Sequence, residues 1–226
     1  MSCDQRVKSG QLMLVRHGEG RANVDGVIAG LSGCAGLTKL GRRQVRALNA
    51  RWAQTGFRPD VLVSSPVRRA RETAEILAAS MPGLGVVEDC ALCEMHNGEA
   101  DGLTWQDYDA KYGRFNVIAE PSRPFAPGAE SWADVMARVR KCMEELASQH
   151  IGKTAVVVTH SGFVIATVLG LLAVQSSTDR ATLDPWYTSI SCWRRGNKRW
   201  SLECFNDTAH LDNLSNQILA RDPTAT

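Results

Sequence analysis

The hydrophobic and polar positions of the chain follow two alternating patterns. Short continuous apolar runs at 12–15, 61–63 and 154–159 are typical of strands buried on both faces. Segments 38–53 and 131–146 place apolar residues at helical spacing. Three further elements are expected: a helix from 65 to about 79, a brief strand at 86–87 and an apolar helix over 161–172. Strands that alternate with helices predict an α/β fold, a three-layer α/β/α sandwich around a mostly parallel sheet.

Polar residues mark the expected starts of three helices. Thr38 is the expected N-cap of the first long helix. Ser65 and Pro66 are expected as the N-cap and first residue of the next one. Ser131 and Asp134 have the spacing of a capping box.

The C-terminal part departs from this alternation. Segments 186–193 and 199–205 predict a hairpin turning at Gly196 and Asn197, which would form a non-parallel edge. The last dozen residues are expected to be frayed. Residues 95–128 are irregular apart from a short helix at about 104–112, and we expect them to form a cap or specificity insertion. The whole chain, 1–226, is expected to be one catalytic domain.

Composition excludes several classes of protein. The chain has 226 residues, 44% of them apolar, with a formal net charge of +2. These values do not fit a disordered chain and give no reason to expect nucleic acid. The apolar stretch 155–174 is interrupted by polar residues at 159–162, and neither piece is long enough to span a membrane. With no secretory signal, the chain is expected to be soluble and cytoplasmic.

The seven cysteines are scattered and odd in number, which predicts reduced thiols. Cys90 and Cys93 have CxxC spacing. A second cysteine or histidine pair that would complete a zinc site is missing, and the motif does not open a helix. We therefore expect neither a metal nor a redox role for it, and no cofactor.

Two expected strands end in the same kind of turn. Arg16 and His17 precede Gly18 in one, and His160 precedes Ser161 and a glycine in the other. Ligands of open α/β sheets bind beyond the carboxyl ends of the strands. The second turn also opens a helix, whose first N–H groups favour an anion.

A third candidate is an arginine-rich helix start. Arg68 and Arg71 have Glu72 and Glu75 four residues on, so they are expected to form a solvated charged face. Arg69 has no such partner, although cations are disfavoured at a helix N-terminus. We therefore expect Arg69 to bind an anion, with phosphate as the best match to its fork of donors.

Together these residues predict a small cationic pocket of Arg16, Arg69, His17 and His160 around one phosphoryl group. A neutral imidazole is a competent nucleophile near neutral pH. The leaving group needs a proton donor. Glu94 is the best candidate, with three competitors: Glu19, Glu99 and Asp101.

The motifs resemble the histidine phosphatase superfamily, which includes cofactor-dependent phosphoglycerate mutases and acid phosphatases. The resemblance runs from about residue 11 to about 211. Its spaced blocks are Leu14-Val15-Arg16-His17-Gly18-Glu19 with Asn23 and Gly36-Leu37-Thr38, Ser64-Ser65-Pro66 with Arg69-Ala70, Leu92-Cys93-Glu94-Met95, Pro127-Gly128-Ala129-Glu130-Ser131 and Val156-Val157-Val158-Thr159-His160.

This resemblance implies a phosphoglycerate mutase-like fold and a metal-independent phosphatase chemistry. It implies that His17 is the phosphorylated nucleophile and Glu94 the acid for the leaving group and then the base for water. It assigns the phosphoryl group to Arg16, Arg69 and His160, and the pocket lining to Asn23; Ser161 is counted with the phosphate-binding residues. Two departures from the family's usual pattern are Gly20 and Ser161, which weaken any analogy about substrate.

Three functions remain open within the resemblance. The favoured one is a phosphomonoesterase acting on a small phosphorylated metabolite. A phosphoglycerate mutase-type phosphotransferase is disfavoured, because residues 94–110 hold five acidic residues and no lysine or arginine and would repel a multiply anionic substrate. A non-catalytic binding protein is the third. The expected partner is a small-molecule phosphate monoester, and homodimerisation is left open. Five aromatic residues fit either a substrate cap or loop packing: Trp105, Tyr108, Tyr112, Phe115 and Phe125.

Overall fold

The computed structural model describes residues 10–174, 182–196, 199–212 and 214. A six-stranded sheet runs through its centre in the order β3-β2-β4-β1-β5-β6. The strands are β1 (Gln11–Arg16), β2 (Val61–Ser64), β3 (Val86–Glu88), β4 (Ala155–Thr159), β5 (Ile190–Arg195) and β6 (Trp200–Asp207). The first four strands in this order run parallel to one another. Strand β5 runs antiparallel to both of its neighbours, β1 and β6. The predicted mostly parallel sheet with a non-parallel edge is confirmed.

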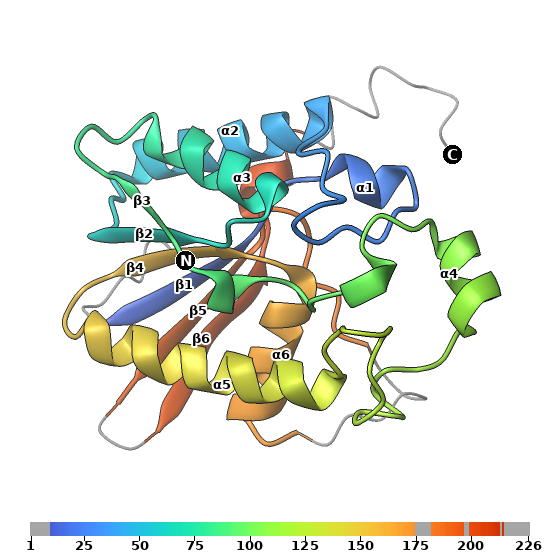
Figure 1. Ribbon diagram of the computed structural model, residues 1–226. Coiled ribbons are helices and arrows are strands. Elements are labelled where there is room, and N and C mark those ends of the chain that lie inside the picture. Colours follow the sequence, from blue (N-terminus) through green and yellow to red (C-terminus); the bar gives the residue numbers. More distant parts are fainter. Residues whose placement is uncertain (1–9, 175–181, 197–198, 213, 215–226) are drawn as a thin grey trace.

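Helices cover both faces of the sheet (Figure 1). The helices α2 (Lys39–Thr55) and α3 (Arg68–Ala78) lie on one face, and α5 (Trp132–Gln149) and α6 (Ser161–Leu171) lie on the other. The side chains of β1 alternate accordingly, with Met13 in the core under α2 and α3 and Leu14 in the core under α5 and α6. The three-layer α/β/α sandwich is therefore confirmed.

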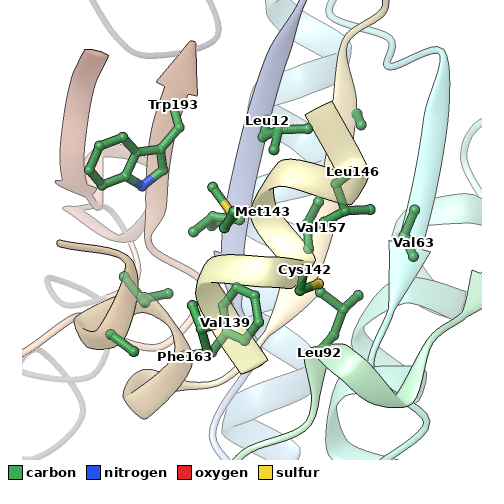
Figure 2. Close-up of a cluster of buried hydrophobic side chains, with 14 of the residues drawn as sticks. Leu12, Val63, Leu92, Val139, Cys142, Met143, Leu146, Val157, Phe163 and Trp193 are labelled. Atoms are coloured by element: carbon green, nitrogen blue, oxygen red, sulfur yellow. The ribbon is translucent and has the colours of Figure 1, made fainter. Parts of the chain in front are cut away.

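The apolar face of α5 packs against the sheet and forms one of the two main hydrophobic cores. Met143 and Leu146 of α5 pack with Phe163 of α6 against Leu12 and Val157 of the sheet (Figure 2). All five side chains are buried. Burying a side chain of this size contributes about 1.5–3 kcal/mol relative to leaving it in water. This packing fixes α5 and α6, the helices that precede and follow β4 in the chain, and the carboxyl end of β4 carries His160.

Two of the three predicted helix starts are confirmed. The Oγ1 of Thr38 accepts a hydrogen bond from the Gly41 N–H at 2.9 Å. Ser131 and Asp134 form a reciprocal capping box. The predicted start of the third helix is wrong, because α3 begins at Arg68 and its N-cap, Val67, makes no side-chain cap bond. The hydroxyl of Ser65, expected there as the cap, lies instead beside an imidazole at the end of β4.

The remaining elements are short. They are α1 (Arg21–Val24), η2 (Cys90–Leu92), η3 (Gly98–Ala100), α4 (Trp105–Tyr112) and η4 (Ala209–Leu211). The predicted terminal hairpin is present, but its first strand begins at Ile190 rather than Trp186, which lies in the turn before it. Asn197 and the chain after 214 lie outside the described residues.

Most of the described cysteines fit the expected reduced thiols. Four of them carry free thiols: Cys34, Cys90, Cys93 and Cys142. The expectation is wrong for Cys204, which is disulfide-bonded. In the described part of the chain, no helix combines the length and the apolar character that crossing a membrane requires.

Candidate active site

The candidate site lies where three neighbouring strands end at one level. Arg16 of β1 pairs with Thr159 of β4, and Ser64 of β2 pairs with Val158 of β4. The next residues continue this register, since His17 N–H donates to the Thr159 carbonyl at 2.9 Å. The strand pairing thus carries residues far apart in sequence to one sheet edge, where ligands of α/β folds bind.

Two imidazoles occupy this edge. His17 is 2% exposed and His160 is 0% exposed, and their ring centroids are 5.1 Å apart. Burial, reinforced by the positive charges of Arg69 and Arg16, holds the pKa of both histidines well below the ordinary value of 6.5. Both rings are therefore neutral near pH 7.

Hydrogen bonds define the tautomer of each ring. His17 Nδ1 lies 2.7 Å from the Gly18 carbonyl oxygen, which only accepts, so the proton is on Nδ1 and the lone pair on Nε2. His160 is reversed: its Nδ1 accepts from Arg69 Nη2 at 3.0 Å, and its Nε2 donates to Ser65 Oγ at 2.9 Å. His17 Nε2 is thus unprotonated and has a lone pair, as nucleophilic attack requires, although it accepts a hydrogen bond from Arg69 in this structure.

Arg69, the predicted anion fork, connects the two rings. Its side chain is buried, and its Nε donates to His17 Nε2 at 2.9 Å while Nη1 donates to the Ala29 carbonyl at 2.8 Å. Gly20 lies against this side chain, since a Cβ there would be 3.1 Å from Arg69 Cδ and 2.9 Å from Asn23 Oδ1. The departure at Gly20 is therefore explained by the close approach of Arg69 and Asn23.

Arg16 lies on the other side of His17 in a partly buried position. Its guanidinium carbon is 4.0 Å from the centroid of the Tyr187 ring, and Nη1 donates to the Pro185 carbonyl. Its Nε is buried and has no hydrogen-bond partner among the described residues. An unpaired buried donor costs about 1–3 kcal/mol, so this N–H is available to an anion that enters the site.

Glu94 follows the η2 turn and faces the start of α6. Its Oε2 accepts from the Gly162 N–H at 3.1 Å, and an ideal Cβ on Gly162 would come within 2.2 Å of its Oε1. Helix α6 can receive the carboxylate only because residue 162 has no side chain. A carboxylate at a helix N-terminus is favoured by the helix dipole.

The three competitors for the acid role have other partners. Glu19 accepts from the Thr38 hydroxyl, and Glu99 is bound by Lys111 and Tyr112. Asp101 accepts three backbone N–H bonds from the loop at 30–33. Of the four carboxylates, the structure brings only Glu94 to the cavity that also contains Arg69.

A cavity of about 350 Å³ reaches Arg69 and Glu94, whereas Arg16, His17 and His160 are not among its lining residues. Asn23, Arg69, Glu94 and Gly162 line it together with an apolar and aromatic wall: Met95, Trp105, Val117, Phe125 and Trp132. Arg69 and Glu94 are the only charged residues among those described as lining it. Segment 94–110 does line the cavity, through Glu94, Met95, Asn97 and Trp105, but its other four acidic residues are not among the lining residues.

The roles of three residues of the site were not predicted from the sequence. Ser65 was expected as a helix cap but holds His160, and Tyr187 supports Arg16 from the loop before β5. Gly162 lines the cavity and binds Glu94, whereas Ser161, the expected phosphate-binding residue, is not among the lining residues. Ser65 could have been found from its place in the Ser64-Ser65-Pro66 block, whereas no local sequence pattern marked Tyr187.

A cluster that could hold a metal lies beside Glu94 rather than at His17 and His160. The ligand atoms of Cys90, Cys93 and His96 all lie within 4.8 Å of one another. No metal was expected there, because no second pair of ligands follows Cys93 in the sequence. The structure instead supplies a single histidine as third ligand.

Comparisons with known proteins agree with this site. The family model of the histidine phosphatase superfamily (branch 1) matches residues 12–208. A metal-independent phosphoserine phosphatase of Arabidopsis thaliana is 28% identical over 90% of this chain and 84% of its own length. A 2,3-bisphosphoglycerate-dependent phosphoglycerate mutase of Chelativorans sp. (strain BNC1) is 34% identical over 67% of this chain and 76% of its own.

Solved structures give the same result. A mycobacterial glucosyl-3-phosphoglycerate phosphatase bound to VO3 superposes with a TM-score of 0.72 at 30% identity, covering 88% of this chain and 99% of that one. A phosphoserine phosphatase from Entamoeba histolytica, in complex with phosphoserine, gives 0.71 at 26% identity, covering 89% and 98%. The chain therefore belongs to the histidine phosphatase superfamily and is a phosphatase of the histidine phosphatase type.

Proposed function

We propose that the protein is a phosphomonoesterase that works through a phosphohistidine at His17. The observation that carries this proposal is the hydrogen bond from His17 Nδ1 to the Gly18 carbonyl, because it leaves the Nε2 lone pair directed at Arg69, which lines the cavity. A neutral, buried imidazole with this tautomer can attack phosphorus without first losing a proton.

The first step transfers the phosphoryl group from the ester oxygen to His17 Nε2. Arg69, which donates to His17 Nε2, and the unpaired Nε–H of Arg16 would donate to the equatorial phosphoryl oxygens. His160 accepts from Arg69 at Nδ1 and donates to Ser65 from Nε2, so in this tautomer it would position Arg69 rather than donate to the phosphoryl group. The hydrogen bond that Arg69 now makes to Nε2 would pass to a phosphoryl oxygen. Glu94 would protonate the departing alkoxide, which leaves as the alcohol.

The second step returns the enzyme to its starting state. Glu94, now a carboxylate, would take a proton from a water molecule, whose oxygen attacks the phosphorus of phospho-His17. Inorganic phosphate leaves and the Nε2 lone pair is restored. Every proton and electron pair is accounted for by His17, Glu94, water and the ester, so no metal or cofactor is required by the proposal.

The cavity wall favours hydrolysis over a mutase reaction. A mutase must hold a second anionic group of its substrate, which calls for a second set of cations. Among the described lining residues, Arg69 is the only cation, and the wall beyond it is apolar and aromatic. We propose that residues 95–128 cap a single catalytic domain and select a small monoester whose alcohol is uncharged or carries an apolar group.

The experiment is an assay of phosphorylated metabolites for both phosphate release and isomerisation, the latter with and without bisphosphoglycerate. Phosphoserine, glucosyl-3-phosphoglycerate and phosphoglycerate belong in the panel because relatives carry those names. We expect phosphate release in the presence of EDTA, and loss of it in His17→Ala. Isomerisation without phosphate release would contradict the proposal.

A further inference from the structure

We propose that Cys90, Cys93 and His96 form a binding site for a thiophilic divalent cation of the zinc class, behind the wall that carries Glu94. The Sγ atoms of the two cysteines are 3.2 Å apart, and Cys90 Sγ lies 3.7 Å from His96 Nε2. With Zn–S about 2.3 Å and Zn–N about 2.0–2.1 Å, a tetrahedral zinc spaces two sulfurs by about 3.8 Å and sulfur and nitrogen by about 3.6 Å. The ligand atoms of Cys93 and His96 lie within 4.8 Å of each other, so the sulfur pair would open by about half an ångström and the His96 ring would move toward Cys93 when the cation binds.

The backbone between the ligands is held in place by other residues. The carboxylate of Asp89 accepts from the Ala91 N–H at 2.8 Å and so closes the η2 turn. The guanidinium of Arg138 donates to the carbonyls of Ala91 and Cys93, both at 2.9 Å. The positions of the two thiols are thus fixed before any cation binds, which reduces the entropy that binding must remove.

The histidine ligand also has the support that metal-bound histidines show. His96 Nδ1 lies 3.7 Å from Glu130 Oε2, and the backbone N–H of His96 donates to the same oxygen at 2.8 Å. Glu130 is itself bound by Arg138 at 2.7 Å. A carboxylate near one ring nitrogen orients the other toward a metal and raises its basicity. Here that other nitrogen is Nε2, the atom that faces Cys90.

The ligand set selects the class of cation. Two thiolates and an imidazole favour zinc and similar cations over magnesium or calcium, which prefer oxygen ligands. Binding would release the two thiol protons to solvent, and the charges of two thiolates and one divalent cation cancel. Neutrality matters because Cys93 is buried.

The fourth position faces a cavity of about 270 Å³, which the three ligands line together with Asn97 and Asp101. Asp101 is engaged by backbone N–H groups of the loop at 30–33, so a water molecule is the fourth ligand we expect.

The site adjoins the catalytic cavity without facing the phosphoryl position. Glu94, Met95 and Asn97 line both cavities, so one wall separates the cation from the substrate. Cys93 Sγ also accepts from Ser65 Oγ at 3.5 Å, and that hydroxyl accepts from His160. Because this wall lies between them, the cation would not contact the substrate, and the proposal stands independently of the proposed phosphatase mechanism.

The test is a titration of the full-length, untagged chain with Co²⁺, in a buffer reduced with a phosphine and free of thiols. We expect one Co²⁺ per chain, a thiolate-to-cobalt charge-transfer band, and displacement of this band by Zn²⁺. Cys90→Ser and His96→Gln should each weaken binding by at least about 10-fold. Cys142→Ala, which removes a buried thiol outside the cluster, should bind as the parent does.

His17→Asn separates this proposal from the phosphatase mechanism, because it should lose activity and keep the charge-transfer band. Circular dichroism melting checks that each variant folds; Cys90 is exposed, so its substitution should leave the fold and the metal-free activity unchanged. A parent protein without the band at saturating Co²⁺ would overturn the proposal. Binding by both ligand variants within about two-fold of the parent would overturn it as well.

Discussion

Replacing Gly162 with alanine should remove the acid function of Glu94 while leaving the protein folded. The new Cβ would lie 2.2 Å from Glu94 Oε1, where ordinary contact begins at 3.4 Å, so the carboxylate must move by about 1 Å. The move also strains the hydrogen bond between the Gly162 N–H and Oε2, now 3.1 Å. A displacement of this size at a reacting group costs about 100-fold in rate.

The effect should depend on the leaving group. Alkoxides leave poorly and need the proton, whereas a nitrophenolate leaves without it. We expect kcat/KM to fall about 100-fold for an alkyl phosphate and by less than about 10-fold for the aryl phosphate. The comparison uses kcat/KM because this constant includes only the steps up to release of the alcohol, before Glu94 acts on water. Glu94→Gln should show the same dependence.

Gly170→Ala is the matched control, since it lies in the same helix. Its Cβ would meet only the flexible end of Met136 at 3.3 Å. Alanine is favoured over glycine in a helix by up to about 1 kcal/mol, so neither variant should lose its fold. If Gly162→Ala hydrolyses the alkyl phosphate at the parent rate, Glu94 is not the acid.

Three further predictions concern the charged groups of the site. The folded-state pKa values of His17 and His160 lie below the unfolded value, so the unfolded chain binds more protons than the folded one. The free energy of unfolding should therefore fall as the pH drops below about 6.5, by up to about 1.4 kcal/mol per pH unit for each histidine. Urea denaturation at pH values from about 7 to about 5 measures this change. A flat profile would contradict the buried, neutral rings. Arg69→Lys replaces a fork by a point charge and should lower kcat/KM by at least about 100-fold, whereas near-parent kinetics would remove Arg69 from phosphoryl binding. Tyr187→Leu removes the aromatic ring that contacts the Arg16 guanidinium, a cation–π interaction worth about 1 kcal/mol, so KM should rise about 5-fold. An unchanged KM would show that this ring does not position Arg16.

The sequence was sufficient for the elements whose pattern is local. The run at 12–15 and the strand at 154–159 read as buried strands because both faces of each strand are covered, and the structure shows two cores on either side of them. Thr38 and Ser131 were predictable as caps because the donors that they satisfy are three residues away. The strand ends carrying His17 and His160 followed from the same reasoning.

Interactions between distant residues were not predictable in this way. Ser65 has the local features of a helix cap, but His160, 95 residues later, takes its hydroxyl as an acceptor. Tyr187 meets Arg16 only because β5 pairs antiparallel to β1. His96 joins the cysteine pair through a turn whose shape depends on Arg138.

In the mechanism we propose, His17 Nε2 carries the phosphoryl group during turnover. The direct measurement is rapid quenching of the enzyme with a phosphate-labelled substrate, followed by peptide mapping under alkaline conditions, in which phosphohistidine survives. We predict label on the peptide containing His17, at up to one group per chain, and its disappearance as inorganic phosphate forms. Label on another residue, or full turnover by His17→Asn, would contradict the account.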